Sequence, residues 1–454
     1  TPIEDEINRL QWQDYLVIGA VMSVSIIIGL YYRFSGGRQS TATEFFSADN
    51  SLGVLPLSIA MMASHVSGIT MLGMSGETYI RGLIVALMYA AGIFTVPIIA
   101  TCYLPVFFEI KVVSIYEVIV RCLHEQYRLL NPASIHAAIY FYFRRNVKVA
   151  THALFLCGPF ILLVGFLTCF TGLSIYVSYK DCDPVMSEKI STYDKILPYF
   201  TVENLSPGVV GLVVSGIFSA SLSTISAMMN SLAAVALEDY VKPLHRKFGI
   251  DFSDNRATFI AKSLTVLNGI ICMFLALIAK TMGSLATVAF SIHGSIGGPI
   301  LGIFTLGMFS ESANEIGTII GMITALCVCL WGTFGRPKPP IPKLPVSIEG
   351  CANSTALMFA EQMNFNSTIQ PDQSSYFYLY RISYLWYNPI GLTITLVVGY
   401  VASIIVRLIQ GKNNIEHDPS LFTPFLAARI RRRRQDAQKT TNSQLFVLEP
   451  SRIR

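Results

Sequence analysis

Charged residues are scarce in this 454-residue chain. Asp, Glu, Lys and Arg together make up 13% of it, about half of the usual share in soluble domains, whereas hydrophobic residues make up 52%. The chain also lacks CxxC, HExxH and Walker patterns, and no nucleophile–base pair or acidic dyad stands out in its apolar segments. These absences argue against an enzyme, a resident metal centre and an organic cofactor.

The few charges leave long uncharged windows between them. A membrane helix needs roughly 17–25 apolar residues, and nine windows reach or nearly reach this length. They are 15–32, 50–76, 82–108, 149–179, 204–237, 263–279, 281–310, 316–335 and 382–406. Because helices satisfy their own backbone groups in lipid, the sequence predicts an all-α polytopic membrane protein with about nine transmembrane helices. The first window is too long for a cleavable signal peptide and is interpreted as a retained helix.

Lys and Arg are concentrated in every second connection between the predicted helices. The last of these basic regions carries the RIRRRR run at 429–434. The other connections hold the acidic start of the chain and the loops 180–203 and 336–380. Because cytoplasmic loops are rich in Lys and Arg, we expect the N-terminus outside, a membrane domain over 1–410 and a basic cytoplasmic tail over 411–454. Membrane lipid is an expected partner of this multi-pass plasma-membrane protein, and nucleic acid is not. The oligomeric state stays open.

The two large exterior loops carry further signals. Asn353 and Asn366 each begin an Asn-Ser-Thr sequon in the loop 336–380, which we expect to be glycosylated. Of nine cysteines, only Cys182 and Cys351 fall outside, one in each loop. In an oxidising compartment this arrangement predicts a disulfide between them.

The window 204–237 has no charge, yet its centre is dense with hydroxyls, namely Ser219, Ser221, Ser223, Thr224 and Ser226. Such groups in a membrane helix either bond to their own backbone or serve a neighbour. A sodium ion is a hard cation that prefers oxygen ligands, and paired hydroxyls with free carbonyls supply them without a buried charge. This helix is therefore a candidate sodium site.

The window 50–76 is interrupted by a small and polar patch, Ala-Ser-His-Val-Ser-Gly at 63–68. Gly68, Gly73 and Gly76 weaken a helix there, and broken helices in transporters offer carbonyls to ions and a half-helix N-terminus to anions. A packing face of small residues is the alternative. His65 is open to three interpretations: a substrate contact, a proton-titrating group or a hydrogen-bonded packing residue. Together with the hydroxyl-rich helix, the patch favours a transporter over a channel, for which a filter-like loop is missing.

Several segments carry a resemblance to a known family. They are TEFFSADNSLGVLPLSIAMMAS, TMLGMSGETYIRG, YLPVFFEIKVVSIYEVI, YKDCDPV, GIFSASLSTISAMMNSLAAVALEDYVKP, GSIGGPILGIFTLGMFSESANEIGTIIG, IEGCANST and ISYLWY. The chain resembles the sodium:solute symporter family, in its sodium-coupled monocarboxylate and multivitamin branch, over nearly its whole length. The resemblance implies a LeuT-type fold of two inverted five-helix repeats.

The resemblance also implies the sodium ligands. They are the carbonyls of Ala63 and Val66 on the broken helix, the carbonyl of Ala220, and the hydroxyls of Ser223 and Thr224. Residues 220, 223 and 224 share one helix face at i, i+3 and i+4. The residues expected to contact substrate are Ser64, His65, Thr70 and Ser291.

The chain departs from the family pattern near 125–148. Family members have four helices between the third span and the span at 149–179, and this segment is too short and too charged to contain even one. The expected LeuT-type fold is therefore incomplete. A skipped exon, an incomplete gene model and a natural short isoform all remain open. The expected function is sodium-coupled symport of a small organic anion, monocarboxylate or vitamin-like. The alternative is a truncated, non-transporting form that acts through partners.

Overall fold

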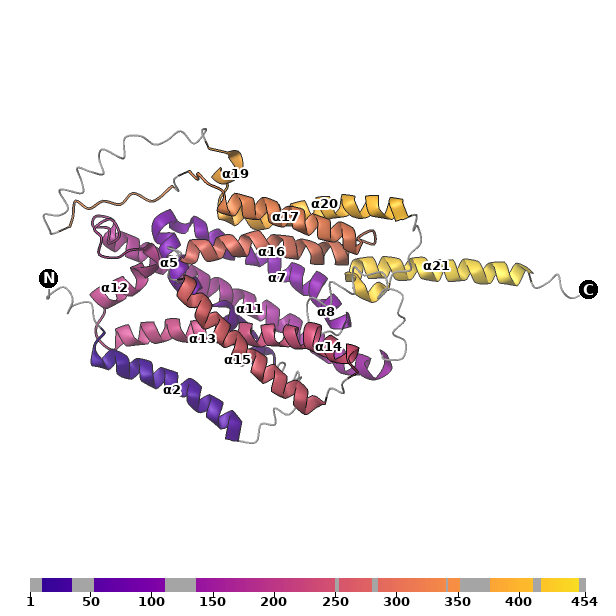
Figure 1. Cartoon of the computed structure of the whole chain (residues 1–454), viewed down its shortest axis with the longest axis horizontal. Helices are drawn as coiled ribbons and strands as arrows, with labels where there is room; N and C mark the ends of the chain where they lie inside the picture. The colour runs from indigo at the N-terminus through magenta and orange to yellow at the C-terminus, as the bar shows by residue number, and fades with distance from the viewer. Residues whose placement is uncertain are drawn as a thin grey trace, which may run out of the picture. The chain divides into compact units, whose positions relative to one another are not determined.

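The computed structural model describes residues 10–34, 53–110, 136–249, 253–279, 285–339, 342–351, 376–410 and 418–448. Within these ranges all regular secondary structure is helical (Figure 1). The all-α prediction from the uncharged windows is confirmed.

Eight helical stretches of the described residues are long and apolar enough to cross a membrane. They are Trp12–Tyr31, Gly68–Glu109, Val147–Tyr179, Val209–His245, Arg256–Ile278, Thr287–Phe309, Glu315–Phe334 and Tyr384–Gln410. The longest, Gly68–Glu109, has 42 residues, about twice what one crossing requires. It bends at Gly82, where φ is 74°, and a short apolar helix, α4 (Val54–His65), precedes it. This stretch and α4 together correspond to the second and third predicted windows.

The segment 125–148 does not hold a helix of its own in its described part. Helix α11 (His136–Tyr179) runs through 44 residues without a break, so the second half of this segment is the beginning of the next helix. At a rise of 1.5 Å per residue, α11 is about 66 Å long, which exceeds the thickness of a bilayer. Residues 125–135 lie outside the described residues, so the prediction that this segment holds no extra span stays a prediction.

The chain divides into two units, 1–96 with 152–291 and 335–382, and 97–151 with 292–334 and 383–454. The first unit holds α2 (Trp12–Phe34), α4, α5 (Gly68–Arg81), α6 (Leu87–Ala90), most of α7 (Gly92–Ile98) and of α11, α12 (Ile196–Asn204), α13 (Val209–Val235), α14 (Lys242–Lys247), α15 (Asp254–Ala279) and α19 (Tyr378–Arg381). The second holds α8 (Leu104–Ile110), most of α16 (Leu285–Phe309), α17 (Glu315–Phe334), α20 (Tyr387–Gln410) and α21 (Pro424–Leu448).

A strap of residues 342–351 is bound to the ends of two helices in the first unit. The backbone N–H of Leu344 donates to the carbonyl of Ile80 at 2.6 Å, and that of Ser347 donates to the carbonyl of Lys180 at 2.8 Å. At its end, Cys351 is joined to Cys182 by a disulfide, with the two Cα atoms 5.0 Å apart. The pairing is the one expected from the two exterior cysteines.

Beside this disulfide, Asp183 is fully buried. Its carboxylate accepts hydrogen bonds from the Tyr79 hydroxyl and from the backbone N–H groups of Val185 and Met186, each at 2.8 Å. Burial, together with the Asp183 carboxylate, raises the pKa of Tyr193 to about 12. Such satisfaction of a buried charge by several donors is what makes it tolerable in an apolar setting.

In the second unit, α17 and α20 meet backbone to backbone. A Cβ on Gly321 would lie 2.6 Å from the backbone nitrogen of Gly399, so no larger residue fits at this crossing. The small and buried residues recur every four positions along both helices, namely Gly317, Gly321 and Ala325 on α17 and Gly391, Thr395, Gly399 and Ser403 on α20. Close approach of this kind drives helix association in membranes.

Candidate ion-binding site

The helix predicted over 50–76 is broken between α4 and α5. Val66 and Ser67 have extended backbone angles, with φ and ψ of −78° and 111° and of −118° and 169°. Ser67 begins α5 as its N-cap, because its hydroxyl accepts a hydrogen bond from the Thr70 N–H and its own N–H donates to the Thr70 hydroxyl. This reciprocal pairing is a capping box, and it fixes where the second half-helix starts.

The break leaves carbonyl groups at the end of α4 without helical partners. The last carbonyls of any helix lack N–H donors four residues on, and here the N–H groups of Ser67 and Thr70 are engaged in the capping box. The carbonyls of Ala63 and Val66 would otherwise accept from these two groups. Their oxygens are therefore available to an ion or to a neighbouring hydroxyl.

Helix α13 supplies those hydroxyls. Ser223 Oγ donates to the carbonyl oxygen of Ala63 at 2.6 Å and lies 2.9 Å from the carbonyl oxygen of Ala220. Thr224 Oγ1 lies 3.2 Å from the carbonyl oxygens of both Val66 and Ala220. The five oxygens implied by the resemblance thus meet at one place, in the first unit.

A sixth oxygen belongs to the same group. The carbonyl of Ser64 lies 3.1 Å from Thr224 Oγ1, whereas the Ser64 hydroxyl donates to its own helix at the carbonyl of Ala60. Ser64 was predicted as a substrate contact, and its role as a source of a backbone oxygen was missed. The signal was available, since Ser64 is one of the last residues of a helix that ends at His65.

The chemistry of this donor set fits a monovalent hard cation. All of its members are neutral oxygens, and among the described residues no group of three or more His, Cys, Asp and Glu side chains could hold a metal ion. Two hydroxyls and the carbonyls at the end of a half-helix would neutralise part of the charge of Na⁺ without a carboxylate, which a divalent ion would favour. Sodium bound here would supply a link between α13 and the break.

Helix α5 begins directly against α13. A Cβ on Gly68 would overlap Ser221 Oγ, and that hydroxyl donates to the carbonyl of Ile217 in its own helix. A larger residue at position 68 would therefore displace the Ser221 hydroxyl. Ser221 faces the start of α5, and no hydrogen bond to the α4 carbonyls is formed by its hydroxyl.

The remaining predicted residues lie in different settings. His65 is exposed at the last position of α4, and Thr70 is held in the capping box. Ser291 is half-buried on α16. Asn353 and Asn366 lie outside the described residues.

One residue that the sequence reasoning missed anchors the hydroxyl-rich helix. Asp14 on α2 is 2% exposed, and its Oδ1 accepts hydrogen bonds from the N–H groups of Gly208 and Gly211. A carboxylate at a helix N-terminus satisfies free N–H groups and complements the helix dipole. The signal was a lone acid two residues into an apolar helix.

The fold and these contacts define a multi-pass helical membrane protein in which a broken helix and α13 bring uncharged oxygens together. Residues 136–325 match the model of the Sodium:solute symporter family. A putative sodium-dependent multivitamin transporter of Drosophila melanogaster is 32% identical over 561 residues, covering 92% of this chain and 92% of the relative. Sodium-coupled monocarboxylate transporter 1 of Homo sapiens is 26% identical, covering 86% of this chain and 87% of the relative.

The chain belongs to the sodium:solute symporter family. It is therefore a transporter, with sodium as the coupling ion, and not an enzyme. A solved structure of a Na⁺-coupled sialic acid symporter in its substrate-bound outward-open state superposes with a TM-score of 0.62 at 15% identity, covering 87% of this chain and 98% of that one. This likeness shows that the fold is the LeuT-type fold that the resemblance implied.

The length of the alignment with the fly relative can be compared with the length of this chain. The alignment with the fly relative extends over 561 positions, more than the 454 residues of this chain. The relative therefore has many residues that have no counterpart here. The predicted loss of helices near 125–148 stays a prediction.

Proposed function

We propose that this chain couples the entry of sodium to that of a small organic anion, monocarboxylate or vitamin-like, across the plasma membrane. The relatives whose names specify monocarboxylates and vitamins support the substrate class. The contact between α13 and the broken helix is the observation that carries the proposal, because it brings uncharged oxygens from two distant segments together.

In this proposal, sodium is held by the carbonyls of Ala63, Val66 and Ala220 and by the hydroxyls of Ser223 and Thr224. The ion replaces the direct hydrogen bonds between these groups with bonds to itself, so it stabilises the arrangement in which α13 lies against the break. A ligand shifts a conformational equilibrium by as much as its affinities for the two states differ. The sodium gradient then drives the anion by favouring the state that binds it.

The anion is placed beside the same break. His65 is exposed there, and α5 begins two residues later with Thr70 in its first turn. A half-helix N-terminus favours an anionic group through its dipole. Ser64 and Ser291 complete the proposed set of substrate contacts.

Uptake by the reconstituted chain tests this function. Proteoliposomes that contain the purified 454-residue protein should accumulate radiolabelled lactate, nicotinate or biotin when an inward sodium gradient is imposed, and should not do so with a choline gradient. Accumulation that is equal with both gradients contradicts sodium coupling.

The surplus of aligned positions in the fly relative favours a second candidate, a shortened sodium-binding form that transports poorly by itself. The helices predicted to be missing include the second broken helix, which in transporters of this architecture shares the substrate site. Under this proposal, sodium raises the thermal unfolding midpoint of the purified protein, but no sodium-dependent uptake occurs. Insertion of the four helices of a relative near 125–148 should then restore uptake.

A further inference from the structure

Helix α21 is attached to the ends of two membrane-spanning helices in the second unit. The N–H of Thr423 donates to the carbonyl of Met308 at 3.1 Å. The apolar contact around it is formed by Leu421, Phe422 and Ile430 with Val106, Phe304 and Met308. Phe304 and Met308 lie in the last two turns of the span Thr287–Phe309. The first turns of α21 are therefore level with the end of the apolar layer.

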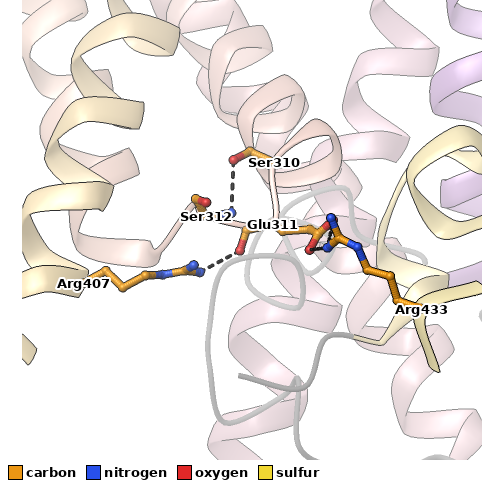
Figure 2. A network of polar contacts seen from close by, with 5 residues as sticks. All are labelled: Ser310, Glu311, Ser312, Arg407 and Arg433. Atoms are coloured by element: carbon orange, nitrogen blue, oxygen red, sulfur yellow. Dashed lines mark hydrogen bonds and ion pairs between the residues drawn. The ribbon is translucent and has the colours of Figure 1, made fainter. Parts of the chain in front are cut away.

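Two ion pairs fix the rotation of α21 about its axis. Arg431 pairs with Glu109 at 3.0 Å, at the end of the span that α8 terminates, and Arg433 pairs with Glu311 at 3.0 Å. Figure 2 shows Arg433 and Arg407 approaching Glu311 from opposite sides, and Arg407 donates to the Glu311 carbonyl oxygen at 2.7 Å. Exposed pairs contribute little stability singly, but together with the buried Ile430 they determine which side of α21 faces away.

The side that faces away has an apolar residue followed by two cations. Phe425 is 83% exposed, and Arg429 and Arg432 are exposed at i+4 and i+7 from it, which places all three on one face. We call these three residues the outer face. Glu109 and Glu311 are already paired with other arginines, so the positive charge of the outer face is not neutralised by them. Asp436 lies one turn further along the same face.

We propose that the outer face binds an anionic phospholipid, with Phe425 among the acyl chains and Arg429 and Arg432 at the phosphate. The order along the helix supports a lipid over a free anion. The aromatic residue lies at the end of the apolar layer, and the arginines follow one and two turns later, at increasing distance from it. Arg recognises phosphate with several N–H donors. A soluble phosphate would use the arginines and would leave the exposed Phe425 unexplained.

Lipid binding by the full chain in a neutral detergent tests this site. Fluorescent phosphatidylserine and phosphatidylcholine are titrated into the delipidated protein and its variants. Each arginine near an anionic lipid surface contributes roughly a fivefold gain in affinity. Arg429→Gln with Arg432→Gln should therefore weaken phosphatidylserine binding by more than tenfold and leave phosphatidylcholine binding unchanged. The matched control removes the same charge further along α21 from the apolar layer, at Arg434 and Lys439, and should change the affinity by less than about threefold.

Two further measurements distinguish a lipid headgroup from free phosphate as the bound anion. Phe425→Ser should weaken phosphatidylserine binding, and millimolar inorganic phosphate should not displace the lipid. The proposal is overturned if the two double variants lose equal affinity, or if phosphate displaces the lipid and Phe425→Ser has no effect. Because the side chains of Phe425, Arg429 and Arg432 are exposed, variants at these positions should keep the thermal unfolding midpoint of the parent protein. Variants that shift this midpoint place the residues in the packing of α21 and also overturn the proposal.

Discussion

Asp14 accepts a hydrogen bond of 2.8 Å from the N–H of Gly211, although the two residues are 197 positions apart. The approach is so close that a Cβ on Gly211 would lie 2.6 Å from the Asp14 Cα. The first apolar helix of the chain is therefore bound to the N-terminus of the helix that carries Ser223 and Thr224.

Replacement of this carboxylate should destabilise the protein. Asp14→Ala leaves the N–H groups of the partly buried Gly208 and the buried Gly211 without their acceptor, and we expect a loss of about 2 kcal/mol in the free energy of unfolding. The thermal midpoint in detergent measures it. Ser23→Ala, on the exposed face of the same helix, removes only a bond to the helix's own backbone and serves as the control. Equal midpoints for the two variants would contradict the anchoring role of Asp14.

Loss of either site hydroxyl should weaken sodium binding. Ser223→Ala and Thr224→Ala each remove one proposed ligand, and we expect a roughly tenfold rise in the sodium concentration that half-maximally stabilises the protein against heat, as for the loss of about 1.4 kcal/mol. Ser221→Ala should change it by less than about twofold, because the Ser221 hydroxyl bonds only to Ile217 among the carbonyls described above.

Thermal midpoints measured in sodium chloride and in choline chloride separate ion binding from transport. If all three alanine variants behave alike, the hydroxyls serve helix packing and the proposed ligand set is wrong.

The buried Asp183 should be essential for the strap region. Asp183→Ala leaves the Tyr79 hydroxyl and the N–H groups of Val185 and Met186 without an acceptor, at a cost of about 3 kcal/mol in the free energy of unfolding. Glu349→Ala, an exposed acid on the strap, should stay within about 0.5 kcal/mol. Limited proteolysis of the strap adds a local readout, since it should accelerate in the Asp183 variant alone.

The disulfide gives a chemical prediction. Peptide mapping without reductant should recover one crosslinked species that contains Cys182 and Cys351. Cys182→Ser should expose Cys351 to a membrane-impermeant maleimide added to intact cells. Two free thiols in the parent protein would exclude the bridge.

Glycosylation tests the proposed orientation. Endoglycosidase should lower the apparent mass of the parent protein, and the double variant Asn353→Gln with Asn366→Gln should show no such change. A persistent shift in that variant would place the sugar elsewhere and would contradict the exterior position of the loop 336–380.

The helices were predictable because absence of charge depends on composition and needs no knowledge of packing. The break near Gly68 was also predictable, since a polar patch with glycines is unfavourable within a membrane helix. The carbonyls of Ala63, Val66 and Ala220 were named from the resemblance, whereas the carbonyl of Ser64 was missed, because its approach to Thr224 Oγ1 depends on how the helices pack. Sequence also could not place Asp14, whose partner N–H groups lie 194 and 197 positions away.

The basic run at 429–434 shows the same limit. Its charge predicted a basic cytoplasmic tail, and the sequence alone did not distinguish one arginine from the next. The structure divides the run between pairs with Glu109 and Glu311 and an exposed face, because these pairs and the buried Ile430 together determine the rotation of the helix. Which arginines are paired and which are exposed therefore depends in part on the tertiary contact of the apolar residue Ile430.

The disulfide between Cys182 and Cys351 also requires an even number of membrane crossings between the two cysteines. Four candidate spans lie between the two cysteines, Val209–His245, Arg256–Ile278, Thr287–Phe309 and Glu315–Phe334. An even number of crossings returns the chain to the side from which it started, so both thiols reach the same compartment. During biosynthesis the bond can close only after the last of these four spans has been threaded. A splice variant that lost one of these spans would place the two cysteines on opposite sides of the membrane. Loss of two spans would keep them on the same side, where the disulfide can form.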